Sequence, residues 1–145
     1  MESYKYDVEQ LLKTGKSVQF PVSGWSMYPF LSDQDMVTVY PLEEKQLKVN
    51  DVVLYRRING PLVLHRIIRI THNGYYMCGD NQSEIEGPLS EEQVFGILTD
   101  YSHNQRIINV SDLSYRIKSN LWRILRPARP IISKTIHQIK KKKHF

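Results

Sequence analysis

Residues 62–80, LVLHRIIRITHNGYYMCGD, decide the fold of this 145-residue chain. Two runs rich in apolar residues flank Asn73-Gly74, and an Asn-Gly pair between two such runs is a strong signal for a β-hairpin. We therefore predict that residues 62–70 and 75–80 are adjacent antiparallel strands.

The same pattern extends outward from this hairpin. Asn59-Gly60 lies between residues 51–57, DVVLYRR, and the strand at 62–70, which predicts a second hairpin. A third hairpin is expected around His103-Asn104. The predicted fold class is mainly β, a small coiled antiparallel sheet or partly open barrel, with a C-terminal α-helical tail. The remaining strands are expected at 17–22, 35–42, 93–101 and 105–110, after a short helix over 6–15 that Asp7 caps and Gly15 ends.

Residues 111–145 differ from the rest of the chain in charge and periodicity. From 112 to 145 there are ten Lys or Arg and one Asp, a net charge of +9. Residues 1–111 carry ten Lys or Arg and fourteen Asp or Glu, a net charge of −4. We therefore predict a β domain over 1–110 and a basic, amphipathic helical tail over 111–145. Pro127 ends the first helix and Pro130 precedes the second, and their apolar stripes are Leu113, Ile117, Leu121, Ile124 and Leu125, then Ile131, Ile132, Thr135, Ile136 and Ile139.

The basic tail has three interpretations. A basic amphipathic helix pair can lie on an anionic membrane surface, where Trp122 would suit the interface. Alternatively, both helices pack on the β domain and their lysines are solvated. The third interpretation is non-specific binding of nucleic acid. We expect no nucleic-acid partner, because the body of the chain is acidic and carries no signature of a nucleic-acid-binding fold.

Cysteine content and hydropathy bear on the compartment. Cys78 is the only cysteine, which excludes an internal disulfide and fits a reducing environment. Residues 1–20 lack the apolar region of a signal peptide, and no window is long and apolar enough to span a bilayer. We expect a cytoplasmic protein, peripheral on the inner membrane face if the tail binds lipid, that uses no metal or other cofactor.

The stretch VSGWSMYPFLSD, residues 22–33, contains a candidate nucleophile at Ser26. A serine hydroxyl needs an adjacent base and donors for the oxyanion. His65 is the histidine that lies inside a predicted strand, where a rigid sheet can aim it, and Asp80 directly follows a strand and could orient the imidazole. The alternative is that Ser26 is only a turn residue and His65 a structural histidine.

Four segments in a fixed order resemble a known family. SGWSMYPFL, VNDVVLYRR, LHRIIRI and CGDNQ, within residues 20–100, resemble the conserved boxes of type I signal peptidases and their LexA-like relatives, the S24/S26 serine peptidases. The resemblance implies that Ser26 is the nucleophile, with Met27 packed beneath it, and that Asp80 is the aspartate of the Gly-Asp-Asn box. His65 stands where endoplasmic-reticulum-type signal peptidases have a histidine base and other members a lysine. Glu86 lies near a further acidic residue of that family and is left outside the core set.

The chain departs from that family in three respects. Residues 1–25, which precede Ser26, are polar, so we expect the usual membrane anchor to be missing. Gly24 stands where many signal peptidases have serine or threonine, so the oxyanion would be bound by the N–H of Ser26, helped by Ser23. The expected substrate-binding or oxyanion residues are thus Ser23, Gly24 and Met27. An autoproteolytic repressor is disfavoured, because there is no preceding DNA-binding segment and no Ala-Gly cleavage pair.

The resemblance implies a signal-peptidase-like serine endopeptidase that acts by a Ser/His mechanism. Its substrate would be an extended peptide lying along a strand edge, with small side chains near the scissile bond. A leader or precursor peptide fits the expected location better than an exported preprotein. The alternative is a catalytically inactive peptide-binding or scaffold module that retains the fold.

Overall fold

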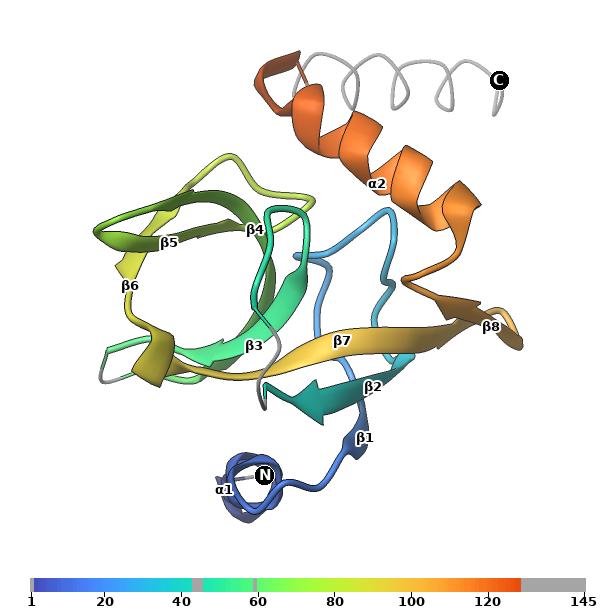
Figure 1. Ribbon diagram of the computed structural model, residues 1–145. Helices are drawn as coiled ribbons and strands as arrows, with labels where there is room; N and C mark the ends of the chain where they lie inside the picture. The colour runs from blue at the N-terminus through green and yellow to red at the C-terminus, as the bar shows by residue number, and fades with distance from the viewer. Residues whose placement is uncertain (1, 43–45, 59, 129–145) are drawn as a thin grey trace.

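The structure is a computed structural model that describes residues 2–42, 46–58 and 60–128 (Figure 1). Its centre is an eight-stranded antiparallel sheet with the order β1-β2-β7-β3-β4-β5-β6, in which β8 pairs with β7. The sheet curls without closing, and a C-terminal helix packs on it, so the predicted fold class is confirmed. The elements are α1 (Glu2–Lys13), β1 (Val18–Pro21), β2 (Met36–Pro41), β3 (Val52–Arg56), β4 (Leu62–Thr71), β5 (Gly74–Cys78), β6 (Glu86–Leu89), η1 (Glu91–Gln93), β7 (Val94–His103), β8 (Arg106–Asn109), α2 (Leu113–Ile124) and η2 (Arg126–Ala128).

The predicted hairpins are present with small changes at their ends. β3 pairs with β4, β4 with β5 and β7 with β8, each in antiparallel register. Two expectations need correction. The first helix begins at Glu2, so Asp7 lies within it and does not cap it. The short strand β6 was not expected, because its sequence EGPL contains Gly and Pro, which are uncommon inside strands.

The curled sheet has two apolar clusters. The first lies between α1, the β1–β2 hairpin and the loop around Ser26, and it includes Met27, Leu54 and Leu64. The second lies inside the curl of β3 to β6, which forms a ring in Figure 1, and it includes Tyr55 and Met77. Because side chains alternate along β3 and β4, each of these strands contributes to both clusters.

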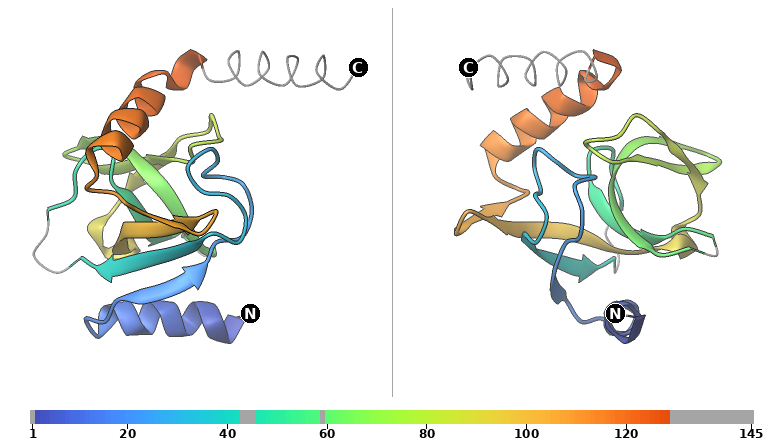
Figure 2. Two further views of the ribbon diagram at one scale, coloured as in Figure 1. Left: turned by 90° about the vertical axis from the view of Figure 1, so that its right-hand side faces the viewer. Right: turned by 180° about the vertical axis from the view of Figure 1, so that it is seen from behind.

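The helix α2 lies on the side of the sheet opposite α1 (Figures 1 and 2). It packs through Tyr115 and Ser119, which are buried, and through Trp122, whose Nε1 donates to the carbonyl of Asp80 at 2.8 Å. Asn50 also donates from Nδ2 to Ser119 Oγ at 2.9 Å. Trp122 therefore contacts the β domain through its indole nitrogen, and its place at a membrane interface stays a prediction.

The predicted apolar stripe of α2 does not make this contact. Four of its members lie within the helix and are largely exposed, namely Leu113, Ile117, Leu121 and Ile124. The first tail helix therefore packs on the domain through other residues. In the described part of the chain, no helix is both long and apolar enough to cross a membrane. The second predicted tail helix lies outside the described residues. The exposed fractions are 70% for Leu113, 59% for Ile117, 55% for Leu121 and 64% for Ile124.

The first prediction concerns Gly74, whose lack of a side chain allows β5 and β6 to lie close together. It has φ of +137°, and a Cβ there would lie 2.4 Å from the carbonyl oxygen of Leu89 on β6. Gly15 has φ of +86° but nothing within 4 Å of such a Cβ, so it is a matched control. Gly15→Ala should lower the free energy of unfolding by about 1–2 kcal/mol, and Gly74→Ala by about 2–4 kcal/mol, because β6 must also move. Urea unfolding measures both values, and equal losses would contradict this close approach.

Candidate active site

Ser26 lies in a tight turn after β1, where the N–H of Tyr28 donates to the carbonyl of Trp25 at 3.1 Å. The carbonyl of Ser26 accepts a hydrogen bond from the N–H of Asn81 at 2.9 Å, which fixes the turn against the Gly79–Asn81 loop. Within residues 2–42, 46–58 and 60–128, neither the hydroxyl nor the N–H of Ser26 has a hydrogen-bond partner. Both groups are therefore available to a ligand.

A groove of about 510 Å³ opens beside Ser26, between the end of β1 and the start of β4. It is lined by Ser23, Gly24 and Met27, and their contact with a substrate stays a prediction. The N–H of Gly24 is already donated to Asp33 Oδ1 at 2.7 Å, so it is not free for an oxyanion. The rest of the lining is mainly apolar and comprises Val8, Phe20, Pro21, Val22, Leu31, Gln34, Leu54 and residues 61–64.

His65 lies on β4 and is almost completely buried, with 1% of the residue exposed. Its Nδ1 is 3.0 Å from the hydroxyl of Tyr55 and 3.8 Å from Oε1 of Glu86. The rings of His65 and Tyr55 meet edge to face, with centroids 5.9 Å apart. Since Tyr55 belongs to the second apolar cluster, His65 is held at the wall of that cluster by packing and by a hydrogen bond.

Glu86, on β6, is an ionised partner of this histidine. Arg57 donates from Nε to Oε1 and Oε2 of Glu86 at 3.0 and 2.9 Å, and its Nη2 also contacts Oε1. Burial by itself raises the pKa of a carboxyl, but the hydrogen bonds from Arg57 and Tyr55 hold the pKa of Glu86 below its usual range. A negative charge is thus fixed on the Nδ1 side of His65.

The imidazole of His65 is neutral near pH 7. Burial lowers its pKa to about 4, because desolvation penalises the charged ring. The carboxylates of Glu86 and Asp80 act in the opposite direction, and the guanidinium of Arg57 acts with burial. A neutral imidazole is the form that can accept a proton, and a pKa of about 4 makes it a weaker base than an ordinary histidine.

Asp80 pairs with Arg66. The carboxylate of Asp80 accepts from Nε and Nη2 of Arg66 at 2.8 and 2.7 Å, and both side chains are almost completely buried. Arg66 also donates from Nη1 to the carbonyl of Asn50 at 2.9 Å and to the hydroxyl of Tyr115 at 3.2 Å. Although burial disfavours the charge of Arg66, Asp80 holds the pKa of the guanidinium above its usual value.

The expectation that Asp80 orients the imidazole therefore needs correction. His65 and Arg66 are successive residues of β4, so their side chains leave the strand on opposite faces. The carboxylate of Asp80 lies on the Arg66 side, whereas Nδ1 of His65 contacts Tyr55 and lies near Glu86. Asp80 influences His65 through its charge, which raises the pKa of the imidazole.

The structure joins some of the predicted residues and not others. The Ser26 turn is bonded to the Asp80 loop, and Asp80 to the strand that carries His65. Across the described residues, Ser26 Oγ makes no hydrogen bond to His65. Tyr55 and Arg57 were missed, although Tyr55 lies on β3, which pairs with β4, and Arg57 directly follows that strand.

The described residues also contain no group of three His, Cys, Asp or Glu side chains that could hold a metal ion.

Among family models, the one described as Peptidase S24-like matches residues 2–99, which include Ser26, His65, Asp80 and Glu86. No curated protein matches the sequence.

The Asp80–Arg66 pair gives the second prediction. Asp80→Asn should lower the free energy of unfolding by about 3–5 kcal/mol, because it leaves the guanidinium of Arg66 buried without a counter-charge. Glu84→Gln neutralises an exposed carboxylate in the same loop and is the matched control, with an expected change within about 0.5 kcal/mol. Chemical denaturation measures both variants. An Asp80→Asn protein as stable as the wild type would show that the pair does not hold the loop.

Proposed function

Because the chain belongs to the Peptidase S24-like family, we propose that it is a serine endopeptidase with Ser26 as its nucleophile and His65 as its base. One observation carries this proposal. The hydroxyl and N–H of Ser26, both without partners among the described residues, lie at a groove large enough for several residues of an extended peptide. The family assignment supports a serine peptidase in general, and the signal-peptidase-like subtype is part of our proposal.

In the proposed reaction, Ser26 Oγ attacks the carbonyl carbon of the scissile bond while its proton passes to Nε2 of His65. The N–H of Ser26, helped by Ser23, binds the oxyanion of the tetrahedral intermediate. Collapse of the intermediate breaks the C–N bond, and the leaving amine takes the proton from His65. A water molecule, deprotonated by the same nitrogen, then attacks the acyl-enzyme, and Ser26 regains its proton.

Tyr55 and Glu86 would set the tautomer of His65 for this reaction. Because the Tyr55 hydroxyl donates to the ionised Glu86, its oxygen would accept a hydrogen bond from Nδ1–H, which leaves the lone pair of the imidazole on Nε2. The charge of Glu86 would then stabilise the imidazolium that forms during attack. Arg57 would act as a positioning residue, because it holds the Glu86 carboxylate from the other side.

The groove also suggests how a substrate is held. β1 is terminal in the described sheet order, and residues 62–64 precede the part of β4 that pairs with β5. Both segments can therefore offer backbone groups to an extended peptide. We propose that the substrate is a leader or precursor peptide, bound through apolar side chains in the groove and with small side chains near the scissile bond.

A second candidate function is a peptide-binding module without catalysis. It is favoured by the absence of a hydrogen bond from Ser26 Oγ to His65 within the described residues. Catalytic hydrogen bonds are often long without substrate and tighten in the complex, so this geometry is also compatible with an enzyme. Binding and cleavage of the same peptides separate the two functions.

The third prediction concerns cleavage of a peptide library with small residues at central positions. Ser26→Ala should abolish cleavage while peptide binding is retained, and Glu86→Gln should lower kcat by about 10²–10⁴-fold, the usual effect of losing an acid–base partner. Glu84→Gln should cleave like the wild type. Wild-type protein that binds the peptides without cleaving any of them would overturn the enzyme proposal in favour of the binding module.

The fourth prediction is a pH dependence. Since the base must be unprotonated, kcat/KM falls as the pH falls through the pKa of His65, which burial sets at about 4 instead of the usual 6.5. Arg57→Gln should move this acid limb to higher pH, because the guanidinium lowers the pKa of His65 and its loss frees the charge of Glu86. Arg56→Gln, next in sequence but paired with Glu9, is the control and should leave the limb in place. Coincident limbs for wild type and Arg57→Gln would exclude His65 as the titrating base.

A further inference from the structure

We infer that α2, together with an arginine-lined cavity at its end, forms a docking surface for membranes that contain anionic phospholipids. This surface is distinct from the groove beside Ser26 and goes beyond the proposed cleavage reaction. Three separate features of the described residues support it: an exposed apolar stripe, cations on both flanks of that stripe, and arginines without carboxylate partners.

The first feature is the direction of the apolar stripe. At about 100° per residue, Leu113, Ile117, Leu121 and Ile124 fall within a sector of about 80°. The packing residues Tyr115, Ser119 and Trp122 are centred about 170° away from the middle of that sector. The stripe therefore faces away from the β domain, in agreement with exposed fractions of 55–70% for its members. An apolar stripe on a helix surface favours burial against another apolar medium.

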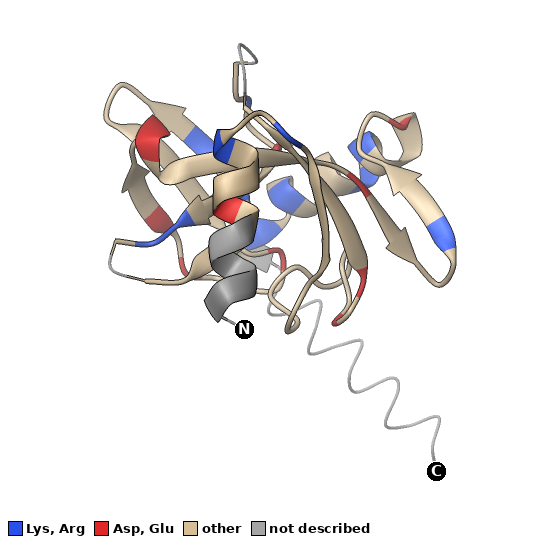
Figure 3. Ribbon diagram, turned by 90° about the horizontal axis from the view of Figure 1, so that it is seen from below, with Lys and Arg blue, Asp and Glu red and all other residues tan. Residues whose placement is uncertain are grey.

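The second feature is the charge on either side of the stripe. Lys118 lies on one flank, and Arg116 and Arg123 lie on the other, each about 90–120° from the middle of the stripe. Residues 113–128 contain no Asp or Glu. In contrast, Figure 3 shows that basic and acidic residues are interspersed on the face that carries α1. An apolar stripe between two rows of cations is the arrangement of helices that lie in an anionic membrane interface.

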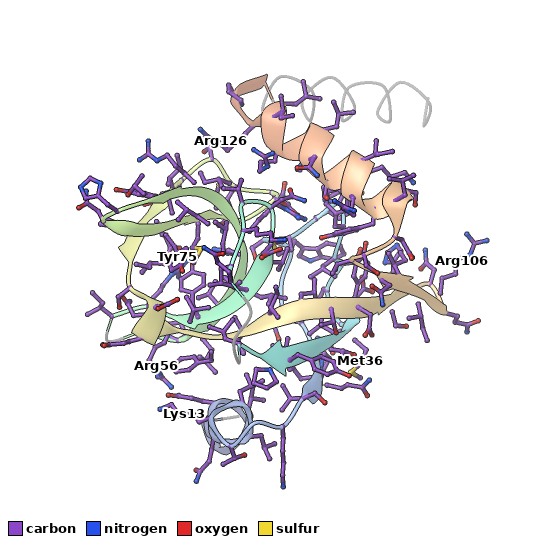
Figure 4. All side chains as sticks on the ribbon, in the orientation of Figure 1. Lys13, Met36, Arg56, Tyr75, Arg106 and Arg126 are labelled. Atoms are coloured by element: carbon purple, nitrogen blue, oxygen red, sulfur yellow. The ribbon has the colours of Figure 1, made fainter. Side chains whose placement is uncertain are left out.

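The third feature is a cavity of about 280 Å³ where the stripe ends. Arg69, Arg123 and Arg126 line it together with Ile124, which belongs to the stripe. Figure 4 labels Arg126 at this end of α2, near the β4–β5 hairpin. Within the described residues, none of these three arginines forms a salt bridge, and Nε of Arg123 is buried without a hydrogen-bond partner. A phosphate headgroup is an anion that such a cluster of guanidinium groups can bind.

The same charges disfavour the other occupants of this surface. A second copy packed stripe to stripe would bring the cationic flanks of two α2 helices together. Residues 129–145 carry six Lys or Arg and no Asp or Glu, so they would add to the positive charge of α2. An anionic lipid surface instead supplies apolar contact and negative charge at once.

Flotation of the full chain with phospholipid vesicles tests the inference. The protein should float with vesicles of phosphatidylcholine and phosphatidylglycerol and remain unbound with phosphatidylcholine alone. Ile117→Ser/Leu121→Ser should lower the partition coefficient at least tenfold, because two apolar side chains lose their burial. Arg69→Gln/Arg126→Gln should lower it about 30-fold, since two cations near the anionic surface are removed.

Matched controls keep the test specific. Ile58→Ser removes an apolar side chain that is 80% exposed in the β3–β4 turn, and Lys13→Gln/Lys16→Gln removes two cations at and after the end of α1. Both controls should float like the wild type, and thermal unfolding should show that all variants remain folded. Failure of the wild type to float, or equal losses in test and control variants, would overturn the inference. A dimer that Ile117→Ser/Leu121→Ser dissociates, with no flotation of the wild type, would instead identify a second copy as the occupant. Cleavage of soluble peptides does not depend on this surface, so it is scored separately.

Discussion

The buried ion pair between Arg66 and Asp80 is the interaction on which the rest of the site depends. Its guanidinium donates four hydrogen bonds, two to Asp80, one to the carbonyl of Asn50 and one to the hydroxyl of Tyr115. These bonds join β4, the loop after β5, the loop before β3 and the helix α2. Since desolvation of two charges is costly, such a pair persists only where its donors and acceptors are satisfied. Here it fixes the loop to which the Ser26 turn is bonded.

This pair also explains why the two acidic residues near His65 differ in role. Asp80 is committed to Arg66 on one face of β4, and Glu86 reaches the vicinity of Nδ1 on the other. The first carboxylate holds the fold, and the second, kept ionised by Arg57, lies where an imidazolium would need a counter-charge. In our proposal, stability and catalysis therefore rest on different carboxylates of the same short segment.

Much of the fold could be predicted from the sequence, because its hairpins are encoded locally by Asn-Gly pairs and apolar runs. The strand β6 could not be predicted, because Gly87 and Pro88 are uncommon inside strands. The position of Glu86 beside His65 could therefore not be predicted either. The order of the motifs identified Ser26, His65 and Asp80 as candidates. It could not show that Asp80 and Glu86 lie on opposite faces of β4 and therefore have different partners. Likewise, the period of α2 predicts an apolar stripe but not the direction in which it points.

The protonation of His65 decides whether this residue can act as the base, and nitrogen-detected NMR of the imidazole can measure it. We predict that Nδ1 carries the proton, that Nε2 is unprotonated near pH 7, and that the ring titrates well below the usual 6.5, toward about 4. Comparison with His65→Gln would assign the signals among the five histidines. A proton on Nε2, or an ordinary histidine titration, would contradict the proposed role of His65 as the base that receives the Ser26 proton.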